Sequence, residues 1–498
     1  MSTQKNLILA IDQSTSATKA MLFNRKAELV NRVSLPHKQY YPRPGFVEHD
    51  PMEIVSNTLK GIAQLTEQSG CKESEIACIA ITNQRETAMI WDRTTGIPVS
   101  HAAVWQCQRG VEFCNQLKEA IKGQFIRDKT GLIIDPYFSA SKLKWIVDNV
   151  EGVKEKMKEG VLMAGTMDSW LVWKLTGGRV HATDYSNACR TMLLNLETLD
   201  WDDDLIELFS LDRSMMPKLE YSDEIIGTTD SAIIFENPIP IAGLMGDSHA
   251  ALFGQNCFSP GMAKATYGTG SSIMMNIGNK PLPPPNGLVT SIGWGREKAI
   301  DYVFEGNIHC TGDTINWLVN DLELLGSAAE TEELAKSLDG NNGVYLVPAF
   351  VGLGAPYWDN QARAAITGMS RDTNKGHFAR AALESIAYQV KDLVDLMGSG
   401  AGISLKELRV DGGPTRNNFL MQFQADMLGN SIVRTSIEEI SALGSAFMAG
   451  LATGFWNSIE EISNLRLVDR TFEPDMEASQ VEKLYAGWLT AVKRVQLI

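Results

Sequence analysis

The sequence predicts an α/β protein of two similar domains that face each other across a central cleft. The chain has 498 residues, 44% of them hydrophobic, which is enough for two domains with a core each. A strand, a polar turn and a second strand are predicted over residues 7–24, and the same pattern returns over 262–278. We interpret the repeat as an internal duplication, with an N-terminal domain over 1–256 and a C-terminal domain over 257–498.

The first predicted hairpin consists of the strand "LILAID" (7–12), the turn "QSTSAT" (13–18) and the strand "KAMLFN" (19–24). The hydroxyl side chains and backbone N–H groups of such a turn can face an anion. The turn is therefore typical of a phosphate-binding hairpin. A third strand is expected within "AELVNRVSL" (27–35).

A helix is predicted next, after a Pro-rich loop. Asp50 can cap its N-terminus, Pro51 suits its first turn, and Glu53 can complete a capping box. The helix is expected to end before Gly70. Because β-branched residues fill "IACIAIT" (76–82), we expect a strand there that is covered on both faces.

The second half is predicted to repeat these elements. Its hairpin carries the turn "YGTGSS" (267–272), and a further strand is expected in "GLVTSIGWG" (287–295). The segment "LKELRVDGGPTRNNF" (405–419) is predicted to be a strand that ends in a glycine-rich turn, where a flat base could approach the backbone closely. Each turn alone could be a simple connection. Together, the two hairpins suit a nucleotide that is held from both sides of a cleft.

The composition disfavours several classes of partner. A formal net charge of -15 is unfavourable for binding nucleic acid or an acidic membrane. The first apolar run, residues 7–11, is far shorter than the ~18 residues that span a bilayer, and it follows a polar start that is unlike a secretory leader. We therefore expect a cytoplasmic protein with no nucleic-acid partner and no membrane partner. Seven scattered cysteines without a C-x-x-C pair indicate reduced thiols.

Several polar residues are candidates for a site, each with a structural alternative. Asp12, at a strand end, could cap its own turn or could hold Mg²⁺ beside phosphates. Arg85 and Glu86 could form a surface ion pair, or could face the cleft and bind a vicinal diol through N–H donors and carboxylate acceptors. Trp105 and Tyr137 could be core aromatics, or could supply the apolar wall and one further hydroxyl of that site.

With these motifs in view, the chain resembles the FGGY family of carbohydrate kinases. The segments "YFSASKLKWIVDN" (137–149) and "AAITGMSRDTNKGHFARAALE" (364–384) fit the two family signatures. Further segments such as "ITNQRET" and "VPAFVGLGAPYWD" are similar to members that phosphorylate glycerol, and the similarity extends over nearly the whole chain. The resemblance implies two ribonuclease-H-like domains of the actin/Hsp70/hexokinase type. It also implies ATP-dependent phosphorylation of a small polyol, with glycerol as the first hypothesis.

The resemblance also implies roles for individual residues. It assigns the general base to Asp247, in "GLMGDSHAALFGQ", and the metal site for Mg²⁺ to Asp12. A primary hydroxyl is a poor nucleophile, so a positioned carboxylate that accepts its proton accelerates the reaction. The polyol residues would be Arg85, Glu86, Trp105, Tyr137, Asp247, Ser248 and Ser272. The residues that bind ATP would be Ser14, Thr15, Ser16, Lys19, Thr269, Gly312, Asn316, Gly413 and Asn417.

The sequence departs from the family pattern at the first phosphate turn. Ser14 stands where glycine is usual, and Lys19 stands where arginine is usual. Lysine keeps the positive charge but lacks the planar fork with which arginine binds two phosphate oxygens.

A second departure concerns the polyol site. Ser248-His249 replaces Gln-Gln, and Ser271-Ser272 replaces Cys-Phe. If Ser248 and Ser272 stand in place of a polyol-contacting Gln and a wall-forming Phe, the pocket is roomier and more polar. That favours a longer polyol such as a tetritol or pentitol, or a pentulose, as the alternative substrate. We expect His249 to face the interior and not to act as a second base or metal ligand.

Two non-kinase hypotheses also fit the fold class. A sugar-sensing regulator would be expected to lack the base or to carry a DNA-binding extension, and neither is seen in the sequence. A chaperone-like ATPase would need a peptide-binding domain, for which no sequence is left over. The sequence is compatible with a homodimer or a homotetramer.

Overall fold

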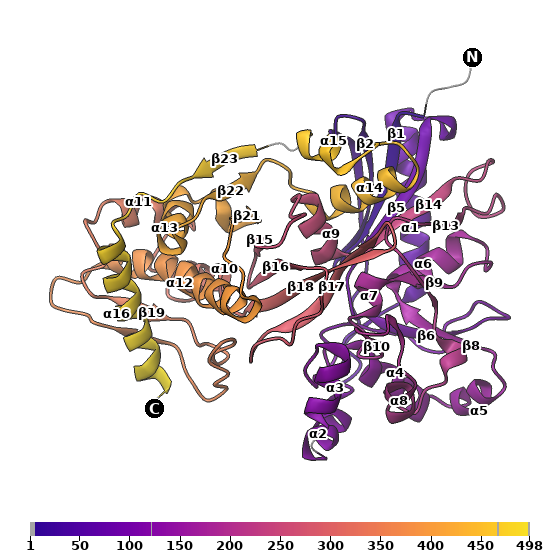
Figure 1. Ribbon diagram of the computed structural model, residues 1–498, viewed down its shortest axis with the longest axis horizontal. Helices are drawn as coiled ribbons and strands as arrows, with labels where there is room; N and C mark the ends of the chain where they lie inside the picture. The colour runs from indigo at the N-terminus through magenta and orange to yellow at the C-terminus, as the bar shows by residue number, and fades with distance from the viewer. Residues whose placement is uncertain (1–4, 121, 466–467, 497–498) are drawn as a thin grey trace.

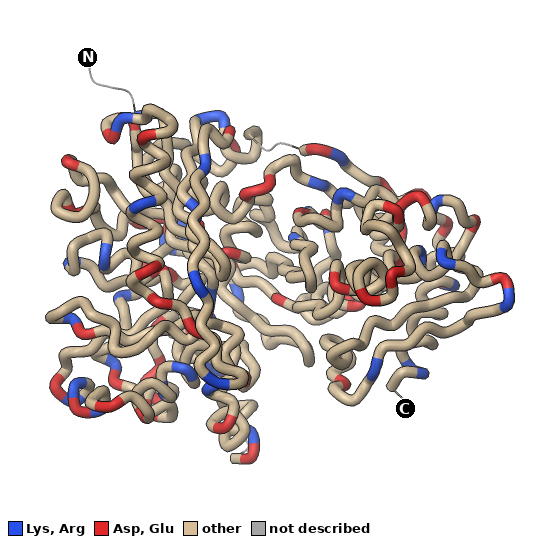
Figure 2. Tube along the Cα trace, turned by 180° about the vertical axis from the view of Figure 1, so that it is seen from behind, with Lys and Arg blue, Asp and Glu red and all other residues tan. Residues whose placement is uncertain are grey.

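The computed structural model describes residues 5–120, 122–465 and 468–496, which form two lobes, each around a β-sheet (Figure 1). The polar residues 1–4 at the start of the chain lie outside the described residues. Figure 2 shows Lys and Arg interspersed with Asp and Glu over both lobes. No helix among the described residues is long and apolar enough to cross a membrane. The described residues also contain no disulfide bond.

The first lobe contains a six-stranded sheet in which the predicted hairpin is central. Its order is β13 (Ile225–Thr228), β14 (Pro240–Gly246), β5 (Ile76–Asn83), β1 (Leu7–Gln13), β2 (Ala17–Asn24) and β3 (Leu29–Pro36). Strand β1 pairs antiparallel with β2 and parallel with β5, and β5 pairs parallel with β14. Every residue of β5 is buried, as its run of β-branched and small residues predicts.

The second lobe repeats this arrangement. Its order is β17 (Val289–Arg296), β18 (Ala299–Ile308), β16 (Ser271–Gly278), β15 (Met262–Tyr267), β21 (Glu407–Asp411), β22 (Ile432–Thr435) and β23 (Val468–Phe472). Strand β15 pairs antiparallel with β16 and parallel with β21, just as β1 pairs with β2 and β5. The predicted strand "GLVTSIGWG" is β17, but β18 lies between it and the hairpin and takes the place that β3 has in the first lobe.

The remaining elements surround these sheets. The helices are α1 (Pro51–Ser69), α2 (Val111–Glu119), α3 (Gly123–Thr130), α4 (Ser139–Asn149), α5 (Val153–Lys158), α6 (Met167–Leu175), α7 (Tyr185–Ala188), α8 (Asp203–Leu208), α9 (Asp247–Gly254), α10 (Gly312–Asn316), α11 (Glu330–Lys336), α12 (Lys375–Ala401), α13 (Asn418–Leu428), α14 (Ile440–Ala452), α15 (Ile459–Asn464) and α16 (Ala478–Gln496). A four-stranded sheet contains β4 (Glu48–His49), β7 (Ala102–Ala103), β6 (Ala88–Asp92) and β8 (Leu162–Thr166). Two-stranded sheets are formed by β9 (Ala182–Asp184) with β12 (Lys218–Glu220), β10 (Leu194–Asn195) with β11 (Asp200–Trp201), and β19 (Tyr345–Val347) with β20 (Ala365–Thr367).

Helix α1 begins and ends as predicted, with one difference. The Asp50 side chain accepts a hydrogen bond from the backbone N–H of Met52, and Gly70 ends the helix with φ 66°. The carboxylate of Glu53 accepts hydrogen bonds from the N–H of Lys38 and does not complete a capping box. This contact ties the helix to the loop that precedes it.

Helix α14 comes from the second half of the chain but packs on the sheet of the first lobe (Figure 1). Ala446 and Phe447 of α14 share a hydrophobic core with Ile8 and Ala10 of β1. The helix also crosses α9 closely, because Gly444 of α14 lies against the backbone of α9. The sequence repeat therefore marks two similar units. The core of the first lobe, however, contains residues from both halves of the chain.

Candidate active site

Three of the predicted site residues lie at the carboxyl ends of neighbouring parallel strands. Asp12 is the last residue but one of β1, Arg85 lies two residues after the end of β5, and Asp247 follows β14 as the first residue of α9. Because β1, β5 and β14 are adjacent and parallel, the sheet brings together residues that are far apart in the sequence. This edge of a sheet is where α/β proteins commonly bind ligands.

Asp247 is accessible and held in place. Its side chain is 40% exposed, and its Oδ1 lies 3.2 Å from Nε of Arg85. The backbone N–H of Ser248 donates a hydrogen bond of 2.6 Å to the same oxygen. One carboxylate oxygen is therefore fixed by donors, and the group still faces solvent, as a base that must meet a substrate requires.

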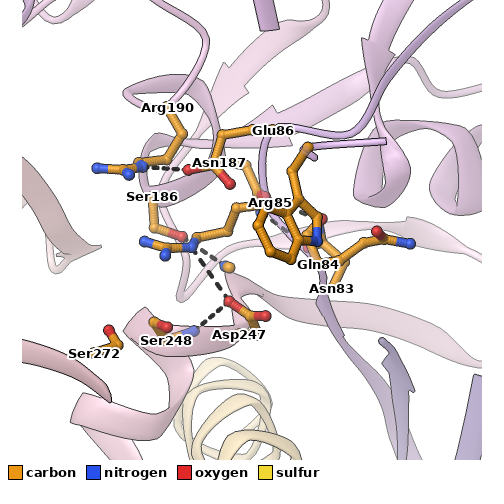
Figure 3. A network of polar contacts seen from close by, with 12 residues as sticks. Asn83, Gln84, Arg85, Glu86, Ser186, Asn187, Arg190, Asp247, Ser248 and Ser272 are labelled. Carbon is orange, nitrogen blue, oxygen red and sulfur yellow. Dashed lines mark hydrogen bonds and ion pairs between the residues drawn. The ribbon is translucent and has the colours of Figure 1, made fainter. Parts of the chain in front are cut away.

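A buried ion cluster next to Asp247 connects the two lobes through Glu305 of the second lobe. Figure 3 shows the members from the first lobe, Arg85, Glu86 and Arg190. Arg85 donates to both oxygens of Glu305 at 2.9 and 3.0 Å, and Arg190 donates to Glu86 at 2.6 Å. Arg190 also lies 2.8 Å from Glu305. All four residues are buried. The alternative of a surface ion pair between Arg85 and Glu86 is therefore wrong.

The cluster sets the charge state of its members. Burial opposes ionisation of Glu305, but the guanidinium groups of Arg190 and Arg85 outweigh it and hold its pKa well below the usual range. For Glu86, burial dominates and raises the pKa above its ordinary value. Arg190 and Glu305 were not predicted from the sequence, because each lies more than 100 positions from its partner in the cluster, Glu86 and Arg85 respectively.

The aromatic pair lies between the polyol candidates and the first hairpin. The rings of Trp105 and Tyr137 meet edge to face, with centroids 5.7 Å apart. Trp105 donates a hydrogen bond of 2.9 Å from its indole N–H to the hydroxyl of Thr15. Both side chains are half-buried, so neither is an enclosed core residue. The contact joins the candidate polyol wall to the candidate phosphate turn.

The first hairpin turn is closed by its own residues. The backbone N–H and the hydroxyl of Ser14 both donate to the carbonyl of Ala17, each at 2.9 Å. Ser14 therefore shapes the turn with its side chain. Thr15 is half-buried and Ser16 is exposed at the tip, where they can meet a ligand.

Lys19 is held by a carboxylate that the sequence did not predict, Glu439. Its ammonium lies 2.6 Å from Oε2 of Glu439 and 3.6 Å from Oδ2 of Asp12. The other oxygen of Glu439 pairs with Arg32 at 2.6 Å. Glu439 precedes α14, so the helix that crosses into the first lobe also places this acid beside the phosphate turn.

Asp12 has the environment of a carboxylate that needs a cation. Burial raises its pKa to about 7, Lys19 opposes this effect, and the nearby charges of Asp247 and Glu439 add to it. The described residues contain no group of three or more His, Cys, Asp or Glu that could form a protein-only metal site. Magnesium in nucleotide sites needs only one or two carboxylates besides phosphate oxygens, so Asp12 fits such an ion.

The second lobe holds a cavity of about 460 Å³ beside the second hairpin. All five residues that were predicted to bind ATP in this half contribute to its wall: Thr269, Gly312, Asn316, Gly413 and Asn417. Apolar side chains from α12 and α13, such as Leu383 and Leu420, form another part of the wall. Thr331 and Glu332 of α11 also line the cavity and were missed. An apolar slot with polar edges suits a nucleobase and its ribose.

Family models match both halves of the chain. The N-terminal domain of the FGGY family of carbohydrate kinases matches residues 7–254, and the C-terminal domain of the same family matches residues 263–453. The chain belongs to the FGGY family of carbohydrate kinases.

Relatives and solved structures agree with this membership. The FGGY chain is 51% identical to glycerol kinase 2 of Thermotoga maritima over 98% of each chain. It is 50% identical to the glycerol kinase of Pseudomonas syringae pv. syringae, over 99% of this chain and 97% of the relative. The crystal structure of Plasmodium falciparum glycerol kinase with ADP is 36% identical and superposes with a TM-score of 0.95, covering 99% of this chain and 98% of that one. The predicted two-domain fold class is confirmed.

The two serines that depart from the family pattern, Ser248 and Ser272, lie beside Asp247 in this FGGY kinase. Figure 3 shows Ser272, Ser248 and Asp247 in a row below the guanidinium of Arg85. His249 points inward and is fully buried, which confirms its predicted position. Neither ring nitrogen has a hydrogen-bond partner among the described residues, and burial lowers its pKa well below the ordinary value. Burial therefore favours the neutral form of this ring.

Proposed function

We propose that this FGGY kinase transfers the γ-phosphoryl group of ATP to a terminal hydroxyl of a small polyol, with glycerol as substrate and glycerol 3-phosphate as product. Membership of the family and the glycerol kinases at about 50% identity support the proposal. The observation that carries it is the accessible carboxylate of Asp247, held by Arg85 at the carboxyl ends of β5 and β14.

In this proposal, Asp247 is the general base. The hydroxyl oxygen of the polyol attacks the γ-phosphorus, the bond from that phosphorus to the β–γ bridging oxygen breaks, and the hydroxyl proton passes to Asp247. ADP leaves with the bridging oxygen. Such proton transfer accelerates reactions by about 10²- to 10⁴-fold, and alignment of the reactants supplies much of the rest.

The surrounding residues orient the polyol. Arg85 has five N–H groups, and the contacts to Asp247 and Glu305 use three of them. Two N–H groups are left to donate to polyol oxygens. Glu86 can accept a hydrogen bond from a neighbouring hydroxyl, while Trp105 and Tyr137 cover the carbon chain.

The nucleotide is proposed to lie between the two hairpins. Thr15, Ser16 and Lys19 would contact phosphates from the first lobe, and the second lobe would hold the adenosine in its cavity. We thus assign polyol binding to residues 1–256 and adenosine binding to 257–498. Asp12 would hold Mg²⁺, which neutralises charge on the phosphate oxygens when it is bound. Because ATP is the phosphoryl donor, we place the enzyme in the cytoplasm.

An assay of the full chain with ATP, Mg²⁺ and glycerol tests the proposal. Formation of ADP is followed by a coupled assay, and phosphorus NMR identifies the product. We expect ADP release that depends on glycerol and a phosphomonoester on a primary carbon. ATP binding without transfer to glycerol or any other small polyol would contradict the proposal and would favour a sugar-sensing protein.

A further inference from the structure

Lys264 of β15 is a buried lysine that forms no direct ion pair with the described residues, although Asp411 lies near it on the other side of the Thr266 hydroxyl. It is fully buried, and no acidic side chain of the described residues lies within 4.0 Å of its ammonium. Its Nζ lies 3.1 Å from the hydroxyl of Thr266 and 3.5 Å from that of Ser272. An ammonium has three donors, so one N–H is unused. Burial lowers the pKa of Lys264, and the nearby charges of Asp411, Glu305 and Asp247 offset this effect only in part. An added hydrogen-bond acceptor would therefore stabilise the ammonium.

The register of the second sheet places Lys264 on the face toward the base. Lys264 and Thr266 are two residues apart on β15, and Thr266 pairs directly with Ser272 of β16, so all three share one face. Met274, two residues after Ser272, packs in a core with residues of α9. The same face therefore lies under the helix that begins at Asp247.

The hydroxyls of Ser248 and Ser272 can also form further hydrogen bonds. Ser272 accepts from Lys264, and neither hydroxyl donates to an atom in the described parts of the chain. Both residues are only half-buried, so a ligand can reach them. They stand beside Asp247 in one row (Figure 3). Two hydroxyls and an ammonium N–H next to a carboxylate suit a neutral ligand that both donates and accepts, which describes an alcohol better than an anion.

We propose that Ser248, Ser272 and Lys264 form a subsite for a hydroxyl-bearing carbon beyond the three carbons of glycerol. The enzyme then phosphorylates linear four-carbon polyols, the tetritols, in addition to glycerol. This inference rests on the proposed function, because the reaction is the same. Asp247 takes the proton of the terminal hydroxyl near it, and that hydroxyl oxygen attacks the γ-phosphorus. The distal hydroxyl does not react. It accepts from Lys264 or a serine and donates to a serine oxygen.

Matched substrates test the subsite. The full chain is assayed with glycerol, erythritol, threitol and butane-1,2,3-triol, which has four carbons but lacks the distal hydroxyl. We expect kcat/KM for the preferred tetritol to exceed that for butane-1,2,3-triol by about tenfold or more, because a polar subsite is left unpaired by the deoxy compound.

Matched variants locate the effect. Ser272→Ala and Ser248→Ala should each lower the ratio of the tetritol kcat/KM to the glycerol kcat/KM by about 3- to 10-fold, and the ratio corrects for any loss of folded enzyme. Ser74→Ala, at an exposed serine of the first lobe, is the control.

Each outcome of these assays supports or overturns the proposed subsite. If the enzyme transfers the phosphoryl group neither to glycerol nor to a tetritol, both this inference and the proposed function are wrong. Transfer to glycerol, with tetritol values below about one hundredth of the glycerol value, overturns the subsite alone. The subsite is also rejected if tetritols react but the ratio is the same in wild type, Ser272→Ala and Ser248→Ala. Tetritol transfer with a ratio that falls in these variants supports it.

Discussion

Glu305 of the second lobe binds Arg85 of the first lobe through both carboxylate oxygens, at 2.9 and 3.0 Å. The pair is buried, and the bidentate geometry fixes the plane of the guanidinium. The remaining Nε of Arg85 then faces Asp247 at 3.2 Å. The orientation of the proposed base in one lobe thus depends on an acid from the other.

Glu305→Gln should impair both stability and catalysis. The substitution leaves Arg85 and Arg190 buried beside a neutral amide, and breaking a buried ion pair in this way costs about 3–5 kcal/mol. We expect a lower Tm by calorimetry and a fall in kcat/KM for the polyol, because Arg85 is no longer held toward Asp247. Glu482→Gln, at an exposed position of α16, is the control. A variant with the Tm and kinetics of the wild type would show that the pair has no such role.

Trp105→Phe should weaken ATP binding although the residue faces the polyol site. The change removes the indole N–H that donates to Thr15 at 2.9 Å, and a neutral hydrogen bond contributes about 0.5–1.5 kcal/mol. We expect the KM for ATP to rise about 3- to 10-fold at saturating glycerol. A double-mutant cycle with Thr15→Val separates the hydrogen bond from other effects. If the effects of the two single changes on the KM for ATP add fully in the double variant, the hydrogen bond does not couple the polyol site to the phosphate turn.

Gly444→Ala should destabilise the contact between α9 and α14. A Cβ at this position would collide with the carbonyl of Ala250, so the helices must separate. Overpacking of this kind typically costs about 1–3 kcal/mol and should lower the Tm. The matched control is Gly123→Ala, where a Cβ would meet no atom within 4 Å. An equal Tm for both variants would argue against close packing at the crossing.

Asp392 of α12 should make stability depend on pH. It accepts hydrogen bonds from Tyr485, Trp488 and Tyr357, and burial raises its pKa from an ordinary 3.8 to about 6. The folded protein thus keeps this proton after the unfolded chain has lost it. The stability that the proton provides is complete below about pH 4 and is lost as the pH rises through about 6.

Asp392→Asn cannot titrate and therefore isolates this effect. The Tm of the wild type minus the Tm of the variant should fall as the pH is raised from about 4.5 to about 7. Calorimetry over this range gives the difference directly. Asp339→Asn, at an exposed position away from α12, is the control. A difference between wild type and Asp392→Asn that stays constant or rises with pH would contradict the assignment.

Local patterns made much of this fold predictable. Both hairpins, α1 and the buried strand β5 follow from alternation, capping residues and turn chemistry within short segments. The five residues that were predicted to bind ATP in the second half line one cavity, and their role in binding ATP stays a prediction. What could not be predicted depends on distant pairing. Glu439 lies 420 positions from Lys19, and no local pattern marks either residue as the partner of the other.

The position of α14 shows the same limit. Its small and apolar residues predict a buried helix but do not say which sheet it covers. Only the folded arrangement shows that it lies on the first sheet and brings Glu439 to the phosphate turn. Likewise, "TNQRET" indicated a functional loop, whereas the burial of Arg85 required Glu305 from the other half.

The turnover number of Asp247→Asn tests the central claim most directly. Asparagine keeps the shape of the side chain but cannot accept the hydroxyl proton at neutral pH. We predict that kcat with glycerol falls about 100-fold or more, while the dissociation constant for ATP, measured by calorimetric titration, stays within about twofold of the wild-type value. Retention of wild-type turnover by Asp247→Asn would contradict the account.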